Sequence, residues 1–321
     1  MQWKLALAFA AAVLQPPAQA QAGASGWPER PVRIVVPAPA GSPSDLIARL
    51  VLEHARPRFG QPLIVENKPG AGGSLGNAEL ARAGGDGYTW MFGPDTVYTV
   101  NPHIYRNPNA KADHVVPVLV ATRFNQTLVC HPALGVKTLP QLLQMARLRK
   151  LDYASGGAGT PGHLASEMLW SAAGVEMQHI PFSGPAPATQ AVLAGTVPCG
   201  FLAGPTVLPH VREGRLVALA VSGTARSPSL PDVPTVAEAG VAGYAADFSM
   251  VLYAPRGTPQ PIVQSFTTTM AAALQTPQVR ESLKRTDQEV VALPPREAGD
   301  LMADISAKWG ALARKINLQI D

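Results

Sequence analysis

Leu151-Asp-Tyr-Ala-Ser-Gly-Gly-Ala-Gly-Thr-Pro-Gly-His-Leu164 predicts a strand, a loop and the start of a helix in direct succession. Residues 151–154 favour the strand, Ser155–Thr160 is a glycine-rich loop, and apolar positions recur at helical spacing over 161–172. The same succession opens the chain, where Val32–Val36 leads through a Pro/Gly/Ser loop into residues spaced for a helix. Strands alternating with helices in two sets predict two α/β units, each built on a parallel sheet.

The rest of the chain continues this alternation, and its 321 residues fit two domains of about 100–200 residues each. Further strands are expected over 63–65, 88–92, 115–120, 127–130, 199–202, 216–221 and 250–253. Further helices are expected near 75–83, 139–148, 187–194, 260–275, 277–285 and 296–316.

The composition excludes several classes of protein. Hydrophobic residues make up 46% of the chain and charged residues 15%, which permits a large core and excludes a disordered chain or a coiled coil. The formal net charge of +4 is spread thinly. Its densest basic runs, at 147–150 and 280–285, contain no aromatic residues, so we expect solvated helix faces and no nucleic-acid partner.

The first residues have the features of a secretory signal peptide. A short positive start ends at Lys4, an apolar run follows over Leu5–Leu14, and Ala18-Gln-Ala20 has small residues at both key positions of a cleavage site. We expect residues 1–20 to be removed, with cleavage after Ala22 as the alternative. The remaining chain has no apolar run long enough for a membrane span, so a soluble protein of the bacterial periplasm is expected.

Cys130 and Cys199 are the two cysteines of the chain, and both stand in apolar, strand-like runs. This setting favours buried free thiols, while a disulfide in an oxidising compartment is the alternative that the sequence leaves open. The histidines show no metal-ligand spacing with either cysteine, so no zinc site or other metal centre is expected.

Open α/β sheets bind ligands beyond the carboxyl ends of strands, where loops meet helix N-termini, and this rule points to four loops. They are Pro37–Asp45, Ser155–Pro161, Phe182–Pro187 and Ala203–Thr206. None of them contains Lys or Arg, so an anion held there would be met by backbone N–H groups, hydroxyls and helix dipoles. Such loops suit reversible binding of a small carboxylate and do not suit general acid–base catalysis, which needs a positioned histidine or carboxyl pair.

The candidate ligand-binding residues lie in these loops and in the turns after the second and third predicted strands. They are Ala38, Ala40, Gly41, Ser42, Asp45, Gly72, Asp95, Thr96, Ser155, Gly159, Thr160, Ser183 and Gly204. Asp45 falls in the first turn of a helix, where a carboxylate capping the helix dipole is the alternative. Thr160 is expected at the N-cap of the following helix and Pro161 at its first position. His163 either touches the ligand or is simply exposed at the start of that helix.

Two glycine-containing motifs suggest other functions and fit them poorly. Gly72-Gly-Ser74-Leu-Gly76 matches the G-x-S-x-G elbow of hydrolases, but the elbow serine stands directly after a strand and four residues from Lys68 intervene here. The glycines at 70, 72 and 76 miss the spacing of a dinucleotide-binding loop. We expect no catalytic residue and no cofactor.

Taken together, a series of short motifs in a fixed order resembles the Bug family, the periplasmic TctC-like substrate-binding proteins of tripartite tricarboxylate transporters. The motifs cover about residues 27–318. They are Trp27-Pro-Glu-Arg-Pro31 with Arg33-Ile-Val-Val-Pro37, Pro39-x-Gly41 with Asp45 and Ala48-Arg49, Val65-Glu-Asn-Lys-Pro-Gly-Ala-Gly-Gly73, Asp86-Gly-Tyr-Thr89, Asn101-Pro102, Tyr153–Ser155 through Gly159–Leu164, Leu230–Thr235 with Glu238-Ala-Gly240, and Ala254–Pro259.

The resemblance implies a two-lobed Venus-flytrap fold, two α/β domains with a cleft between them. Residues 27–123 with 247–321 would form one lobe and residues 124–246 the other. The loops Ala38–Asp45 and Ser155–Thr160 would pinch a ligand carboxylate, partly through bridging waters. The chain departs from the family at Ala38, where an aromatic residue is usual, and at Ser42 and Pro43, where glycines are usual. It also has Pro198 where an acidic residue often stands. The wider first loop suggests a bulkier organic acid than a C4 acid.

We therefore expect a monomeric periplasmic protein that captures a small organic carboxylate and delivers it to the membrane permease of a tripartite tricarboxylate transporter. Closure of the lobes would supply the affinity. The alternatives are a ligand sensor for a signalling receptor and, with less support, a secreted hydrolase using Ser74.

Overall fold

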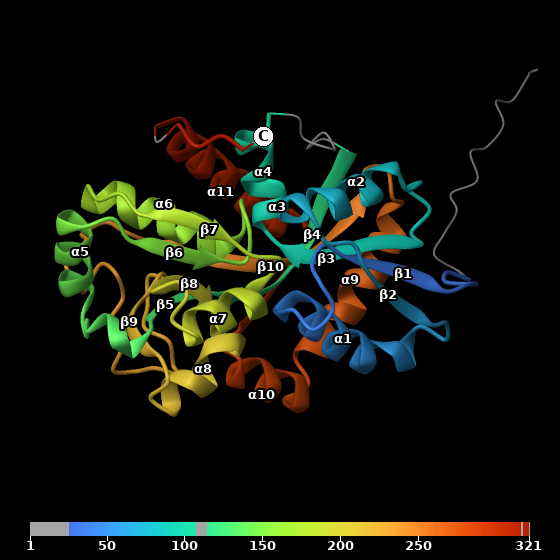
Figure 1. Ribbon diagram of the computed structural model, residues 1–321. Coiled ribbons are helices and arrows are strands. Elements are labelled where there is room, and N and C mark those ends of the chain that lie inside the picture. Colours follow the sequence, from blue (N-terminus) through green and yellow to red (C-terminus); the bar gives the residue numbers. More distant parts are fainter. Residues whose placement is uncertain (1–25, 107–113, 316, 321) are drawn as a thin grey trace, which may run out of the picture.

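The computed structural model describes residues 26–106, 114–315 and 317–320. The predicted signal peptide and both of its cleavage sites lie outside these residues. The described chain forms two α/β lobes, each built around one sheet with helices packed on it (Figure 1). We call the lobe with the six-stranded sheet lobe I and the lobe with the five-stranded sheet lobe II.

The sheet of lobe I has the strand order β11-β4-β10-β3-β1-β2. Its strands are β1 (Val32–Val36), β2 (Leu63–Asn67), β3 (Thr89–Pro94), β4 (Val115–Phe124), β10 (Phe248–Pro255) and β11 (Glu289–Leu293). β1 pairs in parallel with β2 and β3. β10 pairs antiparallel with β3 and β4, and β11 pairs antiparallel with β4.

The sheet of lobe II has the strand order β7-β6-β8-β5-β9. Its strands are β5 (Gln126–Cys130), β6 (Asp152–Ser155), β7 (Gln178–Pro181), β8 (Cys199–Ala203) and β9 (Val217–Val221). β6 pairs in parallel with β7 and β8, whereas β5 pairs antiparallel with β8 and β9.

Both sheets are mixed, so the prediction of two parallel sheets is wrong. The chain leaves lobe I at the end of β4, enters lobe II as β5 and returns to lobe I as β10. A strand that enters a lobe from the junction runs opposite to strands that end there. β5 and β10 are these entering strands, and each is antiparallel to both of its neighbours.

The helices and short 3-10 turns connect the strands. Lobe I contains α1 (Pro43–Ala55), α2 (Ser74–Arg82), α3 (Thr96–Thr99), α4 (Asn101–Ile104), α9 (Gln260–Leu274), α10 (Pro277–Arg285), α11 (Pro295–Lys315) and 3-10 turns over Arg56–Arg58 and Ala71–Gly73. Lobe II contains α5 (Leu139–Leu148), α6 (Pro161–Ala173), α7 (Pro185–Leu193), α8 (Gly204–Arg212) and a 3-10 turn over Pro132–Leu134. The segment predicted as a loop over Ala203–Thr206 instead runs into α8, whose internal Pro209 obscures the helical pattern.

Aromatic packing and the long C-terminal helix tie the lobes into one core. In lobe I, Trp90 stacks on Phe266 at 4.3 Å between ring centroids. α11 packs on β4, α3 and α4 of lobe I, and its Trp309 stacks on Phe248 at the start of β10. Trp309 also shares a small cavity with Leu164 of α6, so α11 reaches the junction with lobe II.

Candidate functional site

A cavity of about 630 Å³ lies between the lobes, where loops from both sheets converge. Its walls are segments after β1, β2 and β3 in lobe I, segments after β6, β7 and β8 in lobe II, and residues beside the chain crossings. Its lining is Pro37–Pro39, Ser42–Ser44, Pro69–Gly73, Pro94, Thr96, Tyr105, Phe124, Gln126, Gly156–Ala158, Thr160–Gly162, Phe182–Pro185, Phe201–Ala203, Met250 and Ile320. No charged side chain is among these lining residues.

A larger hollow of about 1410 Å³ lies on the other side of Phe124, which lines both spaces. Its walls come from both lobes and combine charged residues such as Arg280 and Lys308 with apolar residues such as Met168 and Leu301. We take the smaller cavity as the ligand site because it lies beyond the carboxyl ends of the parallel strands, where α/β sheets bind ligands.

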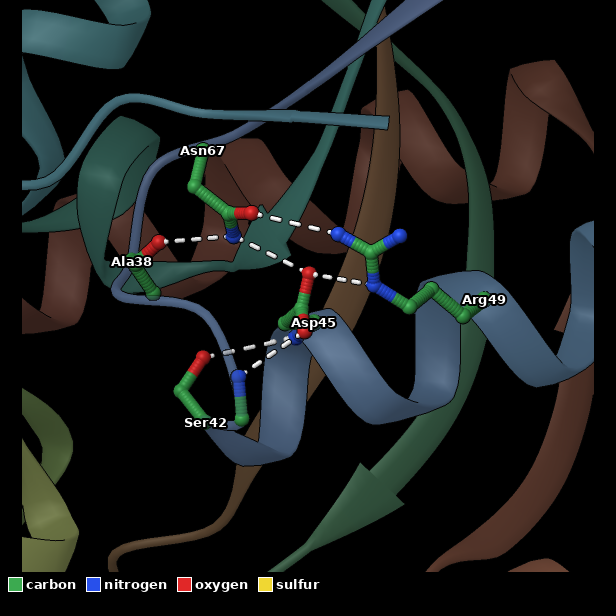
Figure 2. Close-up of polar contacts among 6 residues, drawn as sticks. Ala38, Ser42, Asp45, Arg49 and Asn67 are labelled. Atoms are coloured by element: carbon green, nitrogen blue, oxygen red, sulfur yellow. Dashed lines mark hydrogen bonds and ion pairs between the residues drawn. The ribbon is translucent and has the colours of Figure 1, made fainter. Parts of the chain in front are cut away.

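The loop Ala38–Asp45 in lobe I is held from behind by Asp45 (Figure 2). The Asp45 carboxylate accepts hydrogen bonds from the Gly41 N–H at 2.9 Å, from Arg49 Nε at 3.0 Å and from Asn67 Nδ2 at 3.0 Å. Asn67 Nδ2 also donates to the Ala38 carbonyl at 3.0 Å. The loop therefore has a fixed shape before any ligand arrives.

Asp45 is 2% exposed and is not part of the cavity wall. Burial acts to raise the pKa of Asp45, but hydrogen bonds from Arg49, Gly41 and Asn67 and the charge on Arg49 outweigh burial, so the pKa lies below its usual range. The N-cap of α1 is Ser42, whose hydroxyl accepts from the Asp45 N–H. Asp45 thus lies in the first turn of α1, as the capping alternative expects, and its carboxylate also holds the loop.

The loop Ser155–Thr160 in lobe II is held by two histidines, of which His163 is buried and His179 is half-buried. Ser155 Oγ lies 2.7 Å from His179 Nε2, and the Gly159 N–H donates to His163 Nδ1 at 3.1 Å. The two imidazole rings stack at 4.1 Å between centroids, and Tyr153 stacks on the outer face of His179. Burial lowers the pKa of His163 to about 3, helped by His179, and lowers that of His179 to about 4.

Both rings are therefore neutral near pH 7, which leaves His163 Nδ1 free to accept the Gly159 N–H. His163 is 4% exposed and is not part of the cavity wall, so neither of its sequence-based interpretations describes it. Thr160 stands at the N-cap of α6 and Pro161 at its first position, as predicted, although the Thr160 hydroxyl donates to the Gly157 carbonyl at 2.7 Å.

The two lobes touch each other at the rim of the cavity. Tyr105 of lobe I donates its hydroxyl hydrogen to the Ala158 carbonyl of lobe II at 3.2 Å. A Cβ added at Gly72 would lie 2.8 Å from the same Ala158 oxygen, and one added at Gly159 would lie 3.1 Å from Asn101 Oδ1. Glycine at these positions lets the facing backbones approach closely.

The structure divides the candidate residues into a cavity-lining group and a second group. Those in the cavity wall are Ala38, Ser42, Gly72, Thr96, Thr160 and Ser183. Those outside the wall are Ala40, Gly41, Asp45, Asp95, Ser155, Gly159 and Gly204. Sequence reasoning did not find the apolar lining residues beside the crossings, such as Phe124, Phe201 and Met250, because apolar residues in strands are indistinguishable from core residues.

Asp95 is fully buried at the start of α3, and its N–H donates to the Ser249 carbonyl of β10. Neither carboxylate oxygen has a hydrogen-bond partner among the described residues. Desolvation raises the pKa of Asp95 to about 7, with a further contribution from Asp247. The carboxyl group therefore changes charge near neutral pH, close to where β10 enters lobe I.

Ser74 lacks the setting of a catalytic serine. It begins α2 after the 3-10 turn Ala71–Gly73 and not directly after a strand. It is 4% exposed, and its hydroxyl accepts from Asn101 Nδ2 at 3.0 Å. A nucleophilic serine would instead face a histidine base.

The fold and this cleft define a two-lobed periplasmic solute-binding protein. The family model described as "Tripartite tricarboxylate transporter family receptor" (TctC) matches residues 47–318, and the chain belongs to this family. No helix in the described parts of the chain is both long enough and apolar enough to cross a bilayer.

Sequence relatives cover most of the chain. A UPF0065 protein from the tcbD-tcbE intergenic region of Pseudomonas sp. strain P51 is 33% identical, over 89% of this chain and 86% of its own length. The protein BugT of Bordetella pertussis is 29% identical over 94% of both chains.

Solved structures of similar proteins share the whole two-lobed architecture. The periplasmic binding protein BugD has a TM-score of 0.85 at 30% identity and covers 91% of this chain and 99% of its own. Rpa4515 of R. palustris, solved with adipate, has a TM-score of 0.86 at 31% identity, covering 91% of this chain and 98% of its own. MatC of Rhodopseudomonas palustris, solved with malate, has a TM-score of 0.83 at 29% identity, covering 89% of this chain and 99% of its own.

Proposed function

We propose that this chain captures a small organic carboxylate in the periplasm and delivers it, as a monomer, to the membrane permease of a tripartite tricarboxylate transporter. The observation that carries the proposal is the cavity of about 630 Å³ between two lobes that touch at its rim. Relatives solved with adipate and malate support a carboxylate as the ligand. In this proposal residues 1–20 direct export and are then removed.

The loops from the two lobes would hold the carboxylate. Residues 27–123 with 247–321 move as one body against 124–246, and the acid binds while the lobes are apart. The carboxylate is then met by backbone N–H groups, the hydroxyls of Ser42, Thr160 and Ser183, and bridging waters. Closure removes bulk water from these dipoles and thereby strengthens each contact. A ligand favours closure only by the amount that it binds the closed form more tightly than the open one.

A thermal-shift screen of the mature protein against mono-, di- and tricarboxylic acids tests the binding step. A ligand at 100 times its Kd stabilises the native state by about 2.7 kcal/mol, which raises the Tm by several degrees. Amino acids and sugars at the same concentration are the controls. A panel in which no acid raises the Tm, before or after refolding from denaturant, contradicts the proposal.

Delivery is tested separately in cells. Deletion of the chain in its host should abolish uptake of the radiolabelled acid that the screen identifies, and expression of the full chain should restore it. Analytical ultracentrifugation of the liganded protein should give the mass of a single chain. Uptake that is unchanged by the deletion would contradict a transport role even if binding is confirmed.

A further inference from the structure

The end of the cavity beside the two chain crossings is apolar. Phe124 stands at the end of β4, just before the first crossing, and Met250 stands in β10, just after the second. Phe201 and Leu202 of β8 also line this end, but their side chains are buried in separate core clusters and add little surface to the wall. Both aromatic residues belong to the hydrophobic core as well, so this end of the cavity is a continuation of the core surface.

The same end offers nothing that would neutralise a negative charge. Gln126 provides the single side-chain amide of the cavity wall, and its Nε2 already contacts the Asn125 carbonyl at 3.5 Å. The nearby charged group Asp45 is turned into lobe I, and the imidazoles of His163 and His179 are neutral and lie behind the lobe II loop. A carboxylate buried beside Phe124 and Met250 would lose its hydration and meet no positive charge; the polar group beside it would be the hydroxyl of Ser44, 3.6 Å from Met250 Sδ.

The cavity is also large for a small diacid. Because each water in the liquid occupies about 30 Å³, a space of about 630 Å³ corresponds to roughly 20 waters. Ala38 and Pro39 form part of the wall where the first loop enters the cavity, and the small side chain of Ala38 leaves room beside the loop. A C4 diacid would leave much of this volume filled with water against apolar side chains.

We propose that the ligand is a monocarboxylic acid with a bulky apolar body, such as an aromatic or cyclohexyl ring. Its carboxylate is held by the polar loops at the rim, and its ring lies at the end of the cavity beside Phe124 and Met250. This inference rests on the proposed function and deepens it by excluding acids that carry a second charge at the far end. The apolar contact supplies hydrophobic free energy that a diacid of equal length would lose.

Isothermal titration calorimetry with matched acids tests the proposal. Benzoate and cyclohexanecarboxylate should bind at least tenfold more tightly than adipate and succinate. A diacid that binds as tightly as the ring acids, or more tightly, overturns the proposal and leaves the proposed function intact. If none of the four acids and no other carboxylate binds, the proposed function itself fails.

A variant tests whether the ring acid binds in this cavity. Ala38→Tyr fills the space beside the first loop. It should raise the Kd of cyclohexanecarboxylate tenfold or more and change the Kd of propionate less than threefold. Ala133→Tyr, on the exposed 3-10 turn of lobe II, is the matched control and should change neither. Equal binding of cyclohexanecarboxylate by the wild type and by a folded Ala38→Tyr protein overturns the placement.

An independent observation concerns Cys130 and Cys199, which face each other across strands β5 and β8. The His131 N–H donates to the Pro198 carbonyl, which makes the cysteines a non-hydrogen-bonded antiparallel pair. Such pairs have Cα atoms about 4.5 Å apart, within the range that a disulfide spans. Both side chains are thiols in this structure and both are fully buried, and burial together with the neighbouring Cys199 raises the pKa of the Cys130 thiol.

We infer that these two thiols become a cross-strand disulfide when the chain folds in an oxidising compartment. One thiolate attacks a disulfide of a periplasmic thiol-disulfide oxidant and displaces one of its sulfurs as a thiolate. The second cysteine thiolate then attacks the mixed disulfide and releases the other sulfur. Two electrons pass to the oxidant, and its two sulfurs take up the two protons. Because both cysteines are buried, the bond forms before β5 and β8 are covered.

Alkylation under denaturing conditions tests this inference on protein exported to the periplasm. No cysteine should react with iodoacetamide before reduction, and both should react after it, with an intact mass that rises by 2 Da on reduction. Two alkylated cysteines without reduction overturn the inference. Reduction should also lower the Tm by on the order of 10 °C, since the bond closes a long loop, and Cys130→Ala with Cys199→Ala should abolish this effect.

Discussion

Gly72→Ala is expected to obstruct closure of the lobes. Gly72 lies at the rim in a left-handed conformation, with φ of +58°, and an added Cβ would stand 2.8 Å from the Ala158 carbonyl oxygen of the opposite lobe. It would stand equally close to the Tyr105 hydroxyl, which can rotate away. The Ala158 oxygen belongs to the backbone, so the close contact can be removed only if the lobe II loop moves away.

The size of the effect follows from the distances. Ordinary contacts of a Cβ begin near 3.4 Å, so the facing loop must move by 3.4 − 2.8 = 0.6 Å in the closed form. Overpacking of a close contact costs about 1–3 kcal/mol. This cost applies only to the closed form, so it raises the Kd of the ligand by about 5- to 150-fold. The backbone strain of alanine at positive φ, about 1–2 kcal/mol, is present in both forms and does not enter the Kd.

Gly60→Ala separates the two contributions. Gly60 has φ of +64°, and its added Cβ would meet nothing within 4 Å. Both variants should therefore lower the Tm by a similar amount, but only Gly72→Ala should weaken binding in calorimetry and shift the scattering profile of the liganded protein toward the open form. If Gly72→Ala binds the best acid of the panel with the wild-type Kd, the contact does not form on closure and the argument fails.

Three further variants probe the site. Tyr105→Phe removes the hydrogen bond to the Ala158 carbonyl across the cleft and should raise the Kd about 2- to 10-fold in calorimetry, with little change in Tm. Asp45→Asn should lower the Tm and increase hydrogen exchange over 38–42, because the Gly41 N–H and Arg49 lose a charged acceptor; unchanged exchange would show that the loop holds itself. Burial raises the pKa of Asp95 from 3.8 in the unfolded chain to about 7 in the folded protein. The contribution of Asp95 to the free energy of unfolding is therefore fully present below pH 4 and is lost by the time the pH has risen through 7, on the order of 4 kcal/mol in total. Asp95→Asn should therefore melt higher than the wild type at pH 8 and gain less at pH 5, whereas parallel Tm profiles would contradict the buried charge.

The order of the elements could be predicted from local patterns, and the sheet topology could not. Residues 139–148 and 277–285 form helices with the predicted bounds, because apolar spacing and N-terminal prolines are local signals. β7 was missed because Gln178–Pro181 is short and partly polar. The direction of β10 depends on the chain having crossed into lobe II and back, which no window of residues contains.

In the candidate site, too, the parts set by local sequence could be predicted, and the parts set by the path of the chain could not. The loops that follow β1 and β6 could be predicted from their glycines and prolines, and both contribute to the cavity wall. Phe124 and Met250 could not, because they reach the cavity only where β4 and β10 pass the junction between the lobes. His163 stands three residues beyond its N-cap, but its role depends on His179, which β7 brings beside it.

Three titratable groups beside the cavity lie behind its walls. Asp45 fixes the first loop by its charge, and His163 and His179 fix the second because they are neutral. The loop surfaces that face the cavity consequently carry backbone dipoles, hydroxyls and apolar groups but no charge. A fixed dipole binds a carboxylate weakly while water surrounds it and more strongly when water is removed. Affinity in such a site depends on how well the lobes close, and a close contact such as that of Gly72 with Ala158 can therefore affect the Kd as much as a direct ligand contact.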